Sequence, residues 1–327
     1  RSGGITALAC SPNKKVVAVA ERGERPTVTV YDLASLKKRK VLVCSEAQSQ
    51  GVVNLSFSSD SKQLLAQGAA PDWTMMAWAW EKNKLLATSK VSTASGASVT
   101  CTDFCPWDSS IVSVIGDGLL RFLRIQDGAT KPLTFSFKRE VQQYSCHAWL
   151  PDERLIVAAE SGELLLFEGF EFRGTLNFLQ NQQQQQQQQQ SQINPQHQHQ
   201  QPQSMPADLL DEEVEPISVH SLVVYNKGFV CGCSQNTVQV FESSDDPHEY
   251  YRHTKTFVVD GNKSRVTSLA LSPSEDNLAC SLANNQVYVL GLSNTDILKA
   301  EEMSFELLTT SVHGPFSADA TAGPVGA

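Results

Sequence analysis

The fold is decided by one recurring stretch, seen most clearly at Ser145–Glu168, SCHAWLPDERLIVAAESGELLLFE. Apolar and polar residues alternate up to the turn at Pro151, and two further apolar runs follow, the last ending in Phe167-Glu168. Period-two alternation interrupted by turn residues predicts three antiparallel strands joined by hairpins. The pattern occurs six times, and the other copies read ITALACSP–VVAVAE–TVTVYD from Ile5, VNLSFSSD–LLAQG–MMAWAWE from Val53, VTCTDFCP–IVSVIG–LLRFLRI from Val99, SVHSLVVY–FVCGC–TVQVFE from Ser218 and VTSLALSP–NLACSLA–QVYVLG from Val266.

The copies recur at a nearly fixed spacing. Their turn residues Pro12, Ser59, Pro106 and Pro151 lie at steps of 47, 47 and 45 residues, and Pro273 follows 122 residues after Pro151, which is two steps plus an insertion. A repeat of about 40–50 residues indicates stacked supersecondary units, because a single small sheet cannot bury both of its apolar faces. The pattern predicts an all-β fold, a WD40-type β-propeller with six recognisable blades and almost no helix.

Each copy also has a candidate fourth strand. The third runs end in aromatic-acid pairs where a WD repeat has Trp-Asp: Tyr31-Asp32, Trp80-Glu81, Phe167-Glu168 and Phe241-Glu242. The candidate fourth strands are KVLVC (40–44), KLLATSKV (84–91), LTFSF (133–137), TLNFL (175–179), TKTFVV (254–259) and SFELLTT (304–310).

The repeats lack most of the polar residues that usually stiffen a WD blade. No copy has the Gly-His pair before its first strand, and the Asp that supports the turn between the second and third strands is clear only at Asp117. We therefore expect packing to provide most of the cohesion between blades.

A segment of different composition separates the fourth and fifth copies. It contains Gln182–Gln190, the stretch NPQHQHQQPQ and the acidic run DLLDEEVEP, with few large apolar groups to offset the entropy cost of ordering. The predicted organisation is four copies in residues 1–179, a Gln-rich disordered insertion at 180–215, two copies in 216–310 and a disordered tail at 311–327.

The acidic composition of the chain excludes some classes of binding partner. The net charge is −9 and the pI about 5.3, which argues against general binding to nucleic acid or to anionic membranes. No apolar run is long enough to span a membrane, and the amino terminus does not have a signal-peptide layout. We expect an intracellular protein, soluble, whose true beginning precedes Arg1.

Eight cysteines lie almost entirely on predicted strands, where other copies have small or apolar residues. Reduced, buried thiols are the expected state. Cys231 and Cys233 face one side of a strand, but no second Cys or His pair stands at zinc-site spacing. We predict no metal site and no cofactor.

The sequence contains no motif of a nucleophile elbow, a phosphate-binding loop or a zinc protease. We expect no catalytic residues, and the candidate site residues are protein contacts. Lys37, Lys38, Arg39 and Lys40 form a basic cluster suited to an acidic partner or to a filament surface such as tubulin, unless they are only a solvated hairpin tip.

A tryptophan at another hairpin is the second candidate contact. Asp72 and Trp73 follow Pro71 at a hairpin that should face one rim, where an exposed Trp is a typical binding hot spot. Trp73 folded back on its own blade is the alternative. Trp78 and Trp80 alternate with Ala79 and are predicted to be core residues.

In several long segments outside the repeat pattern, the sequence resembles the amino-terminal propeller of one family, cilia- and flagella-associated protein fifty-seven. Members of this family are WD-repeat proteins of the motile axoneme. The segments occur in order along the chain: KRKVL (Lys38–Leu42), DSKQLLAQ (Asp60–Gln67), WAWEKNK (Trp78–Lys84), HAW (His147–Trp149), GELLLFE (Gly162–Glu168), KGFVC (Lys227–Cys231), SPSEDNL (Ser272–Leu278) and NQVY (Asn285–Tyr288).

The resemblance implies a cytoplasmic scaffold of the cilium or flagellum that helps to position inner-arm dynein and regulatory complexes on doublet microtubules. Implied partners are subunits of these complexes and tubulin. Against the family's seven blades, six copies predict an incomplete ring that is open or strained. Competing readings are a WD-repeat adaptor of another cytosolic complex, such as a ubiquitin-ligase substrate receptor or a translation factor, and a propeller hydrolase.

Overall fold

The computed structural model describes residues 4–92, 97–177, 217–246, 249–259, 263–292 and 297–299. The chain divides into two compact units, Arg1–Leu179 and Gln180–Ala327, and each is described by itself. The predicted insertion at 180–215 and the predicted tail at 311–327 lie outside the described residues.

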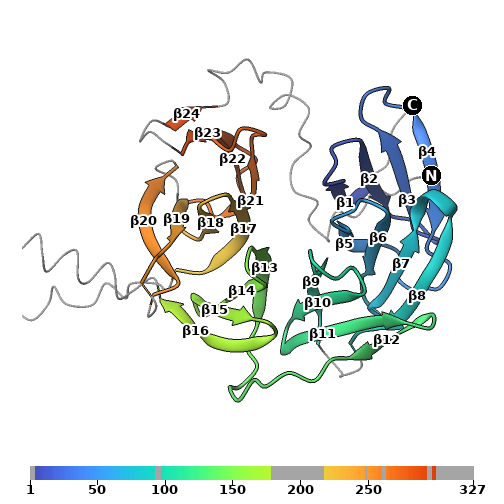
Figure 1. Cartoon of the computed structure of the whole chain (residues 1–327). Coiled ribbons are helices and arrows are strands. Elements are labelled where there is room, and N and C mark those ends of the chain that lie inside the picture. Colours follow the sequence, from blue (N-terminus) through green and yellow to red (C-terminus); the bar gives the residue numbers. More distant parts are fainter. Residues whose placement is uncertain are drawn as a thin grey trace, which may run out of the picture. The chain divides into compact units, whose positions relative to one another are not determined.

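The first unit contains four antiparallel sheets of four strands, here called blades 1 to 4 (Figure 1). Each is a meander in which every strand pairs with the next one along the chain. The strands are β1 (Ile5–Cys10), β2 (Val16–Glu21), β3 (Thr27–Asp32) and β4 (Lys38–Val43) in blade 1; β5 (Val52–Phe57), β6 (Gln63–Gly68), β7 (Thr74–Ala79) and β8 (Lys84–Lys90) in blade 2; β9 (Val99–Phe104), β10 (Ile111–Gly116), β11 (Leu119–Gln126) and β12 (Ala129–Pro132) in blade 3; and β13 (Tyr144–Leu150), β14 (Arg154–Ala159), β15 (Glu163–Glu168) and β16 (Glu171–Asn177) in blade 4.

The second unit contains blades 5 and 6 with the same meander order. The one helical element in the described residues is the short 3-10 turn η1 (Trp80–Lys82). The six predicted blades and the near absence of helix are therefore confirmed for this part of the chain. The strands are β17 (Val219–Tyr225), β18 (Gly228–Cys233), β19 (Thr237–Ser243) and β20 (Tyr251–Val258) in blade 5, and β21 (Val266–Leu271), β22 (Asn277–Leu282), β23 (Val287–Gly291) and β24 (Ile297–Lys299) in blade 6.

Two predicted fourth strands were wrong. In blade 3 the outer strand is β12, and the predicted strand 133–137 is not part of the sheet. Its alternate side chains Leu133, Phe135 and Phe137 instead pack on the core between blades 3 and 4, where Phe135 lies edge-on to Phe122 at 5.1 Å. In blade 6 the strand that pairs with β23 is β24, and the predicted 304–310 lies outside the described residues.

The blades share one irregularity in their strand pairing. In all six, the pairing of the first and second strands shifts by one residue near the beginning of the first strand, for example between Ile5 and Ala7. A second shift lies in the third strand at Tyr31, Phe167 and Phe241, the aromatic residues of the aromatic-acid pairs. Bulges of this kind increase strand twist.

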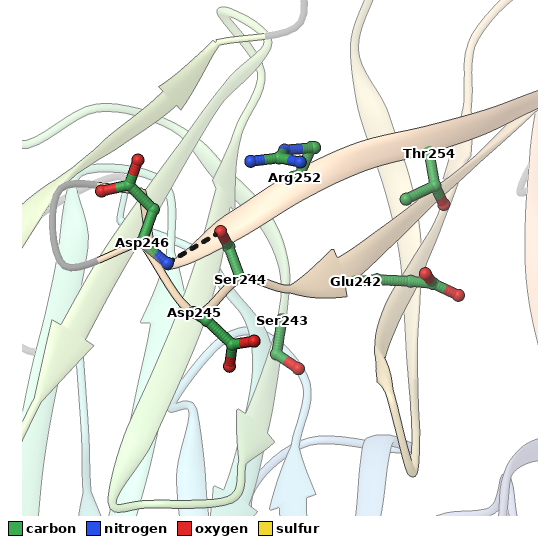
Figure 2. Close-up of a pocket in the computed structure, with 7 residues that line it drawn as sticks. All are labelled: Glu242, Ser243, Ser244, Asp245, Asp246, Arg252 and Thr254. Atoms are coloured by element: carbon green, nitrogen blue, oxygen red, sulfur yellow. Dashed lines mark hydrogen bonds between the residues drawn. The ribbon is translucent and has the colours of Figure 1, made fainter.

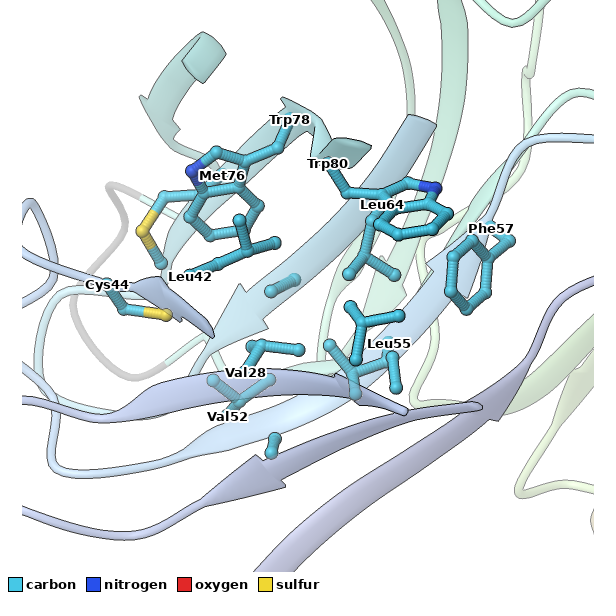
Figure 3. Close-up of a cluster of buried hydrophobic side chains, with 14 of the residues drawn as sticks. Val28, Leu42, Cys44, Val52, Leu55, Phe57, Leu64, Met76, Trp78 and Trp80 are labelled. Atoms are coloured by element: carbon cyan, nitrogen blue, oxygen red, sulfur yellow. The ribbon is translucent and has the colours of Figure 1, made fainter. Parts of the chain in front are cut away.

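The apolar residues lie between blades, as the repeat pattern predicts. Between blades 1 and 2, Val28 and Leu42 pack with Leu64 and Trp78 (Figure 3). Trp78 and Trp80 are 4% and 3% exposed, which confirms them as core residues. The buried indole N–H of Trp80 donates to the Ser61 carbonyl oxygen at 2.8 Å, so its polar atom is satisfied.

In each blade, the burial pattern of the second strand shows whether other blades cover both faces of the sheet. In the first unit blades 2 and 3 have neighbours on both sides, and β10 is buried along its whole length. In blade 1, by contrast, β2 alternates: Val16, Ala18 and Ala20 are buried, whereas Val17 and Val19 are half-exposed. Within the first unit, one apolar face of blade 1 is therefore accessible, and it includes Leu8, which is paired with Val19 and 62% exposed.

Candidate protein-binding rim

The turns between first and second strands form one rim of each unit, because all blades are meanders with the same order. A serine and an Asx residue shape the turn in blade 2: Ser58 donates to Asp60 at 2.7 Å, and the same carboxylate accepts the Lys62 backbone N–H at 3.0 Å. These hydrogen bonds, that of Ser58 first, lower the pKa of Asp60. Ser11 and Asn13 repeat the arrangement in blade 1.

Hydrogen bonds connect these turns from one blade to the next. The Asn13 backbone N–H donates to Ser61 Oγ at 3.2 Å, Ser59 Oγ donates to the Pro106 carbonyl oxygen at 2.7 Å, and Gln63 Nε2 donates to Ser109 Oγ at 3.1 Å. In the second unit the Asn226 backbone N–H donates to Glu275 Oε2 at 2.8 Å. Packing is thus supplemented by polar links that were not predicted, although each joins residues about one repeat apart.

A second polar network connects the inner strands. Asn54 Oδ1 accepts hydrogen bonds from the backbone N–H and the hydroxyl of Thr102 at 3.2 and 3.0 Å, and Ser56 donates to Asp103. Ser113 Oγ and His147 Nε2 lie 2.6 Å apart across blades 3 and 4.

This network does not have the geometry of a hydrolytic triad. The Asp103 carboxylate bonds to Ser56 rather than to His147, whose Nδ1 is buried with no partner among the described residues. Burial lowers the pKa of His147 to about 4, so the ring is neutral at pH 7. The arrangement holds blades together, and the prediction of no catalytic residues stays a prediction.

The predicted basic cluster lies at the beginning of the outer strand β4. Lys37, Lys38 and Arg39 are exposed, and Lys40 is half-exposed. Arg39 Nε forms an ion pair with Asp32 Oδ2 at 3.3 Å, and hydrogen bonds from Ser35 are the first cause of the lowered pKa of Asp32. The lysines are accessible, so both predicted interpretations, a contact surface and a solvated hairpin tip, stay open.

The hairpin of Asp72 and Trp73 is built differently from the expectation. Asp72 is buried, and its Oδ2 accepts hydrogen bonds from the Gln48 backbone N–H at 2.9 Å and from Thr74 Oγ1 at 2.6 Å. Asp72 therefore stabilises its own hairpin and is not available as a surface contact. Trp73 is half-buried and packs on the core between blades 2 and 3, which matches the folded-back alternative.

An exposed tryptophan that the pattern did not single out lies on the rim of blade 3. Trp107 is 39% exposed and packs edge-on against Trp149, with ring centroids 5.0 Å apart at 87°. Its position in the Pro106–Ser110 turn was the available signal, since side chains at a hairpin tip have few neighbours.

The second unit has a shallow acidic hollow of about 310 Å³ between β19 and β20. Its acidic residues are Glu242, Asp245 and Asp246, and Arg252, the cross-strand partner of Glu242, also lines it (Figure 2). The Asp246 backbone N–H donates to Ser244 Oγ at 3.2 Å. These contacts shape the turn, and nothing further in the described residues points to a ligand.

All eight cysteines are in the reduced thiol form. Five are buried, as predicted, but Cys10 is exposed on the accessible face of blade 1, and Cys101 and Cys146 are partly exposed. The described residues contain no cluster of three His, Cys, Asp or Glu side chains that could hold a metal ion. Within the same part of the chain, no helix is long and apolar enough to cross a membrane.

Comparison with known proteins identifies the fold. The model of the WD domain, G-beta repeat, matches residues 253–289, which span the last strand of blade 5 and three strands of blade 6. The β-propeller domain of Cps50 (Swd1) from Myceliophteria thermophila superimposes with a TM-score of 0.69 at 14% identity and covers 91% of this chain and 87% of that one. The chain is a WD-repeat β-propeller.

Sequence relatives extend the comparison. Cilia- and flagella-associated protein 57 of Mus musculus is 30% identical over 336 residues, which include 96% of this chain and 27% of the mouse protein. The predicted resemblance is confirmed. Protein 57 A of Tetrahymena thermophila is 20% identical over 92% of this chain, and cilia- and flagella-associated protein 44 of Mus musculus is 27% identical over 51% of it. The chain spans about a quarter of the length of the protein 57 relatives.

Proposed function

We propose that this chain is the propeller of a non-catalytic scaffold in the axoneme of cilia or flagella. The observation that carries the proposal is the similarity to cilia- and flagella-associated protein 57 along 96% of the chain. The scaffold helps to position inner-arm dynein and regulatory complexes for motility. Its partners are axonemal proteins, including subunits of those complexes and tubulin, and it takes no cofactor, nucleic acid or membrane.

The rim supports a role in binding rather than in chemistry. Its turns are held by hydrogen bonds within and between blades, so the side chains that point outward are presented by a rigid frame. Preorganised surfaces lose little conformational entropy on association. The basic cluster of β4 is accessible and suits an acidic partner, such as the tubulin surface.

We also propose that the six blades belong to a seven-bladed ring. The support is the accessible apolar face of blade 1, where Leu8, Val41 and Val43 are 62%, 39% and 48% exposed. In blade 6, Ala279 and Ser281 of β22 are likewise partly exposed between buried Leu278, Cys280 and Leu282. Cys10 lies on the accessible face of blade 1, so its thiol should react quickly in this chain and slowly in the full-length protein.

Localisation of the tagged full-length protein in ciliated cells tests the function. We expect it along the axoneme, retained after detergent extraction, and we expect axonemes from cells lacking it to lose part of their inner-arm dyneins. Recovery of the protein with ubiquitin-ligase subunits, and normal beating of cilia after its removal, would contradict the proposal.

A further inference from the structure

Trp107 is the most exposed of the five tryptophans. It lies in the turn between β9 and β10, whereas Trp78, Trp80 and Trp149 are 4%, 3% and 8% exposed and Trp73 is half-buried. An indole that remains 39% exposed in a folded protein is available to a partner. Tryptophan is also the residue most enriched among those that dominate binding energy at interfaces.

The position of Trp107 is fixed by the residues below it. Its ring packs edge-on against the ring of Trp149. The Trp149 ring in turn packs on Phe170 and Phe122, with ring centroids 6.2 and 6.0 Å away. The neighbouring Pro106 carbonyl oxygen accepts the hydrogen bond of Ser59 from blade 2. Trp107 is therefore held by both adjacent blades, and ordering it on binding costs little entropy.

Two exposed carboxylates lie in the turn of blade 4 that follows Trp149. The turn after Trp149 exposes Asp152 and Glu153, and the Glu153 carbonyl oxygen accepts the Gly169 backbone N–H at 2.9 Å. Trp149, whose ring packs against Trp107, precedes Asp152 and Glu153 by three and four residues. The turn of blade 4 that exposes these two carboxylates therefore lies next to the turn of Trp107.

The cations nearby are already paired. Arg124 contacts Asp108 at 3.3 Å, and Arg154 contacts Glu168 at 3.0 Å. Asp152 and Glu153 have no ion pair in the described part of the chain, so their charge is available to a binding partner. An exposed indole flanked by unpaired carboxylates is suited to a cationic side chain, which the ring attracts through its π face while a carboxylate neutralises the charge.

We propose that Trp107, Asp152 and Glu153 form a docking site for a basic segment of a partner protein, with an arginine or lysine side chain against the Trp107 ring. The site deepens the proposed scaffold function and rests on it for its biological meaning. It differs in charge from the basic cluster of β4, so the two surfaces select partners of opposite sign.

Purified chain and synthetic peptides test the proposal without reference to cilia. The probes are fluorescently labelled peptides of alternating Arg and Gly, of alternating Lys and Gly, and of alternating Glu and Gly, all of one length, with binding followed by anisotropy at low and moderate salt. We expect the cationic peptides to bind and the Glu peptide not to bind. Trp107→Ala should weaken binding by about tenfold, and Trp107→Phe by less, because Phe retains a weaker π face.

Charge variants separate this site from the general attraction of an acidic protein. Asp152→Asn with Glu153→Gln should weaken binding several-fold and reduce its salt dependence. Glu24→Gln with Glu81→Gln, at two exposed positions away from Trp107, removes the same number of charges, is the matched control and should have little effect. Circular dichroism and thermal unfolding check that each variant is folded, and Trp107→Phe supplies the test if Trp107→Ala is not.

Three results would overturn the proposal: equal binding of the cationic peptides by the native chain and by the Trp107 variants, an equal loss of binding in the control with Glu24→Gln and Glu81→Gln, or preferential binding of the Glu peptide. Because these measurements use purified components, a failure here leaves the axonemal function standing. Conversely, a protein absent from axonemes could still bind the basic peptides at Trp107.

Discussion

Ser56 on β5 donates a hydrogen bond to Oδ1 of Asp103 on β9 and so connects the inner strands of blades 2 and 3. Burial raises the pKa of Asp103 to about 6, although hydrogen bonds from Ser56 and from the Phe104 backbone N–H act against this rise. His147, in the next blade, has the opposite response, because burial lowers its pKa to about 4. The two groups therefore contribute to stability with opposite dependence on pH.

The sign follows from proton uptake. Between its ordinary pKa of 3.8 and about 6, Asp103 binds more protons in the folded state, so its contribution to the free energy of unfolding increases as pH falls through this range. Between its ordinary pKa of 6.5 and about 4, His147 binds more protons in the unfolded state, so its contribution decreases as pH falls. In the native chain the two effects partly cancel.

Asp103→Asn should expose the effect of His147 alone. We expect this variant to lose roughly 1–3 kcal/mol more stability than the native chain between pH 7 and pH 4, measured by urea unfolding at a series of pH values. His147→Gln is the reciprocal variant and should lose less stability on acidification than the native chain. Parallel pH profiles for all three proteins would show that neither group titrates as inferred.

The packing between blades 1 and 2 predicts a large loss of stability when one buried leucine is shortened. Leu64 is fully buried between the two sheets, and Leu64→Ala should reduce the free energy of unfolding by about 2–5 kcal/mol. Leu36 is the matched control, since it is 76% exposed at the β3–β4 turn and Leu36→Ala should change stability by less than about 0.5 kcal/mol. Denaturant unfolding followed by Trp fluorescence measures both, and similar losses would contradict the assignment of this core.

The blades could be predicted from sequence because their signal is local. The continuous apolar run from Leu155 to Ala159 reflects a strand that is buried on both faces, and the turn residues mark its ends. The outer strand of blade 3 was predicted wrongly because the local pattern misleads there. Apolar residues alternate more clearly at Leu133, Phe135 and Phe137 than in the polar β12. These three side chains pack on the aromatic core, and their segment does not join the sheet.

The candidate contacts were harder to predict because exposure depends on partners distant in sequence. In the sequence Asp72 has the pattern of an exposed turn residue, but in the structure it accepts a hydrogen bond from the backbone N–H of Gln48, 24 positions away. The links between blades could have been found from the repeat itself, since Ser59 and Pro106 are 47 positions apart and Asn54 and Thr102 are 48 apart. Equivalent turns of adjacent repeats must lie side by side in any stack of blades.

The Gln-rich segment should be dispensable for folding. Replacing residues 180–215 with a short Gly/Ser linker should change the free energy of unfolding by no more than about 1 kcal/mol, because the entropy of closing a loop depends only on the logarithm of its length. Thermal and urea unfolding of the deletion variant measure the change. A control in which the Gln residues are replaced by Ser at constant length separates composition from length, and a large loss of stability in either protein would show that the segment packs on the blades.

The basic cluster of β4 should act through association rather than folding. Lys37→Glu with Lys38→Glu leaves the Arg39–Asp32 pair in place, so we expect stability to change by less than about 0.5 kcal/mol, as is usual for exposed positions. Binding of the full-length protein to isolated axonemes should weaken several-fold at low salt and much less at high salt, because ions screen exposed charges. Lys131→Glu with Lys138→Glu reverses two other exposed lysines and is the matched control. Equal losses from both pairs in a co-sedimentation assay would mean that net charge, and not this hairpin, determines the affinity.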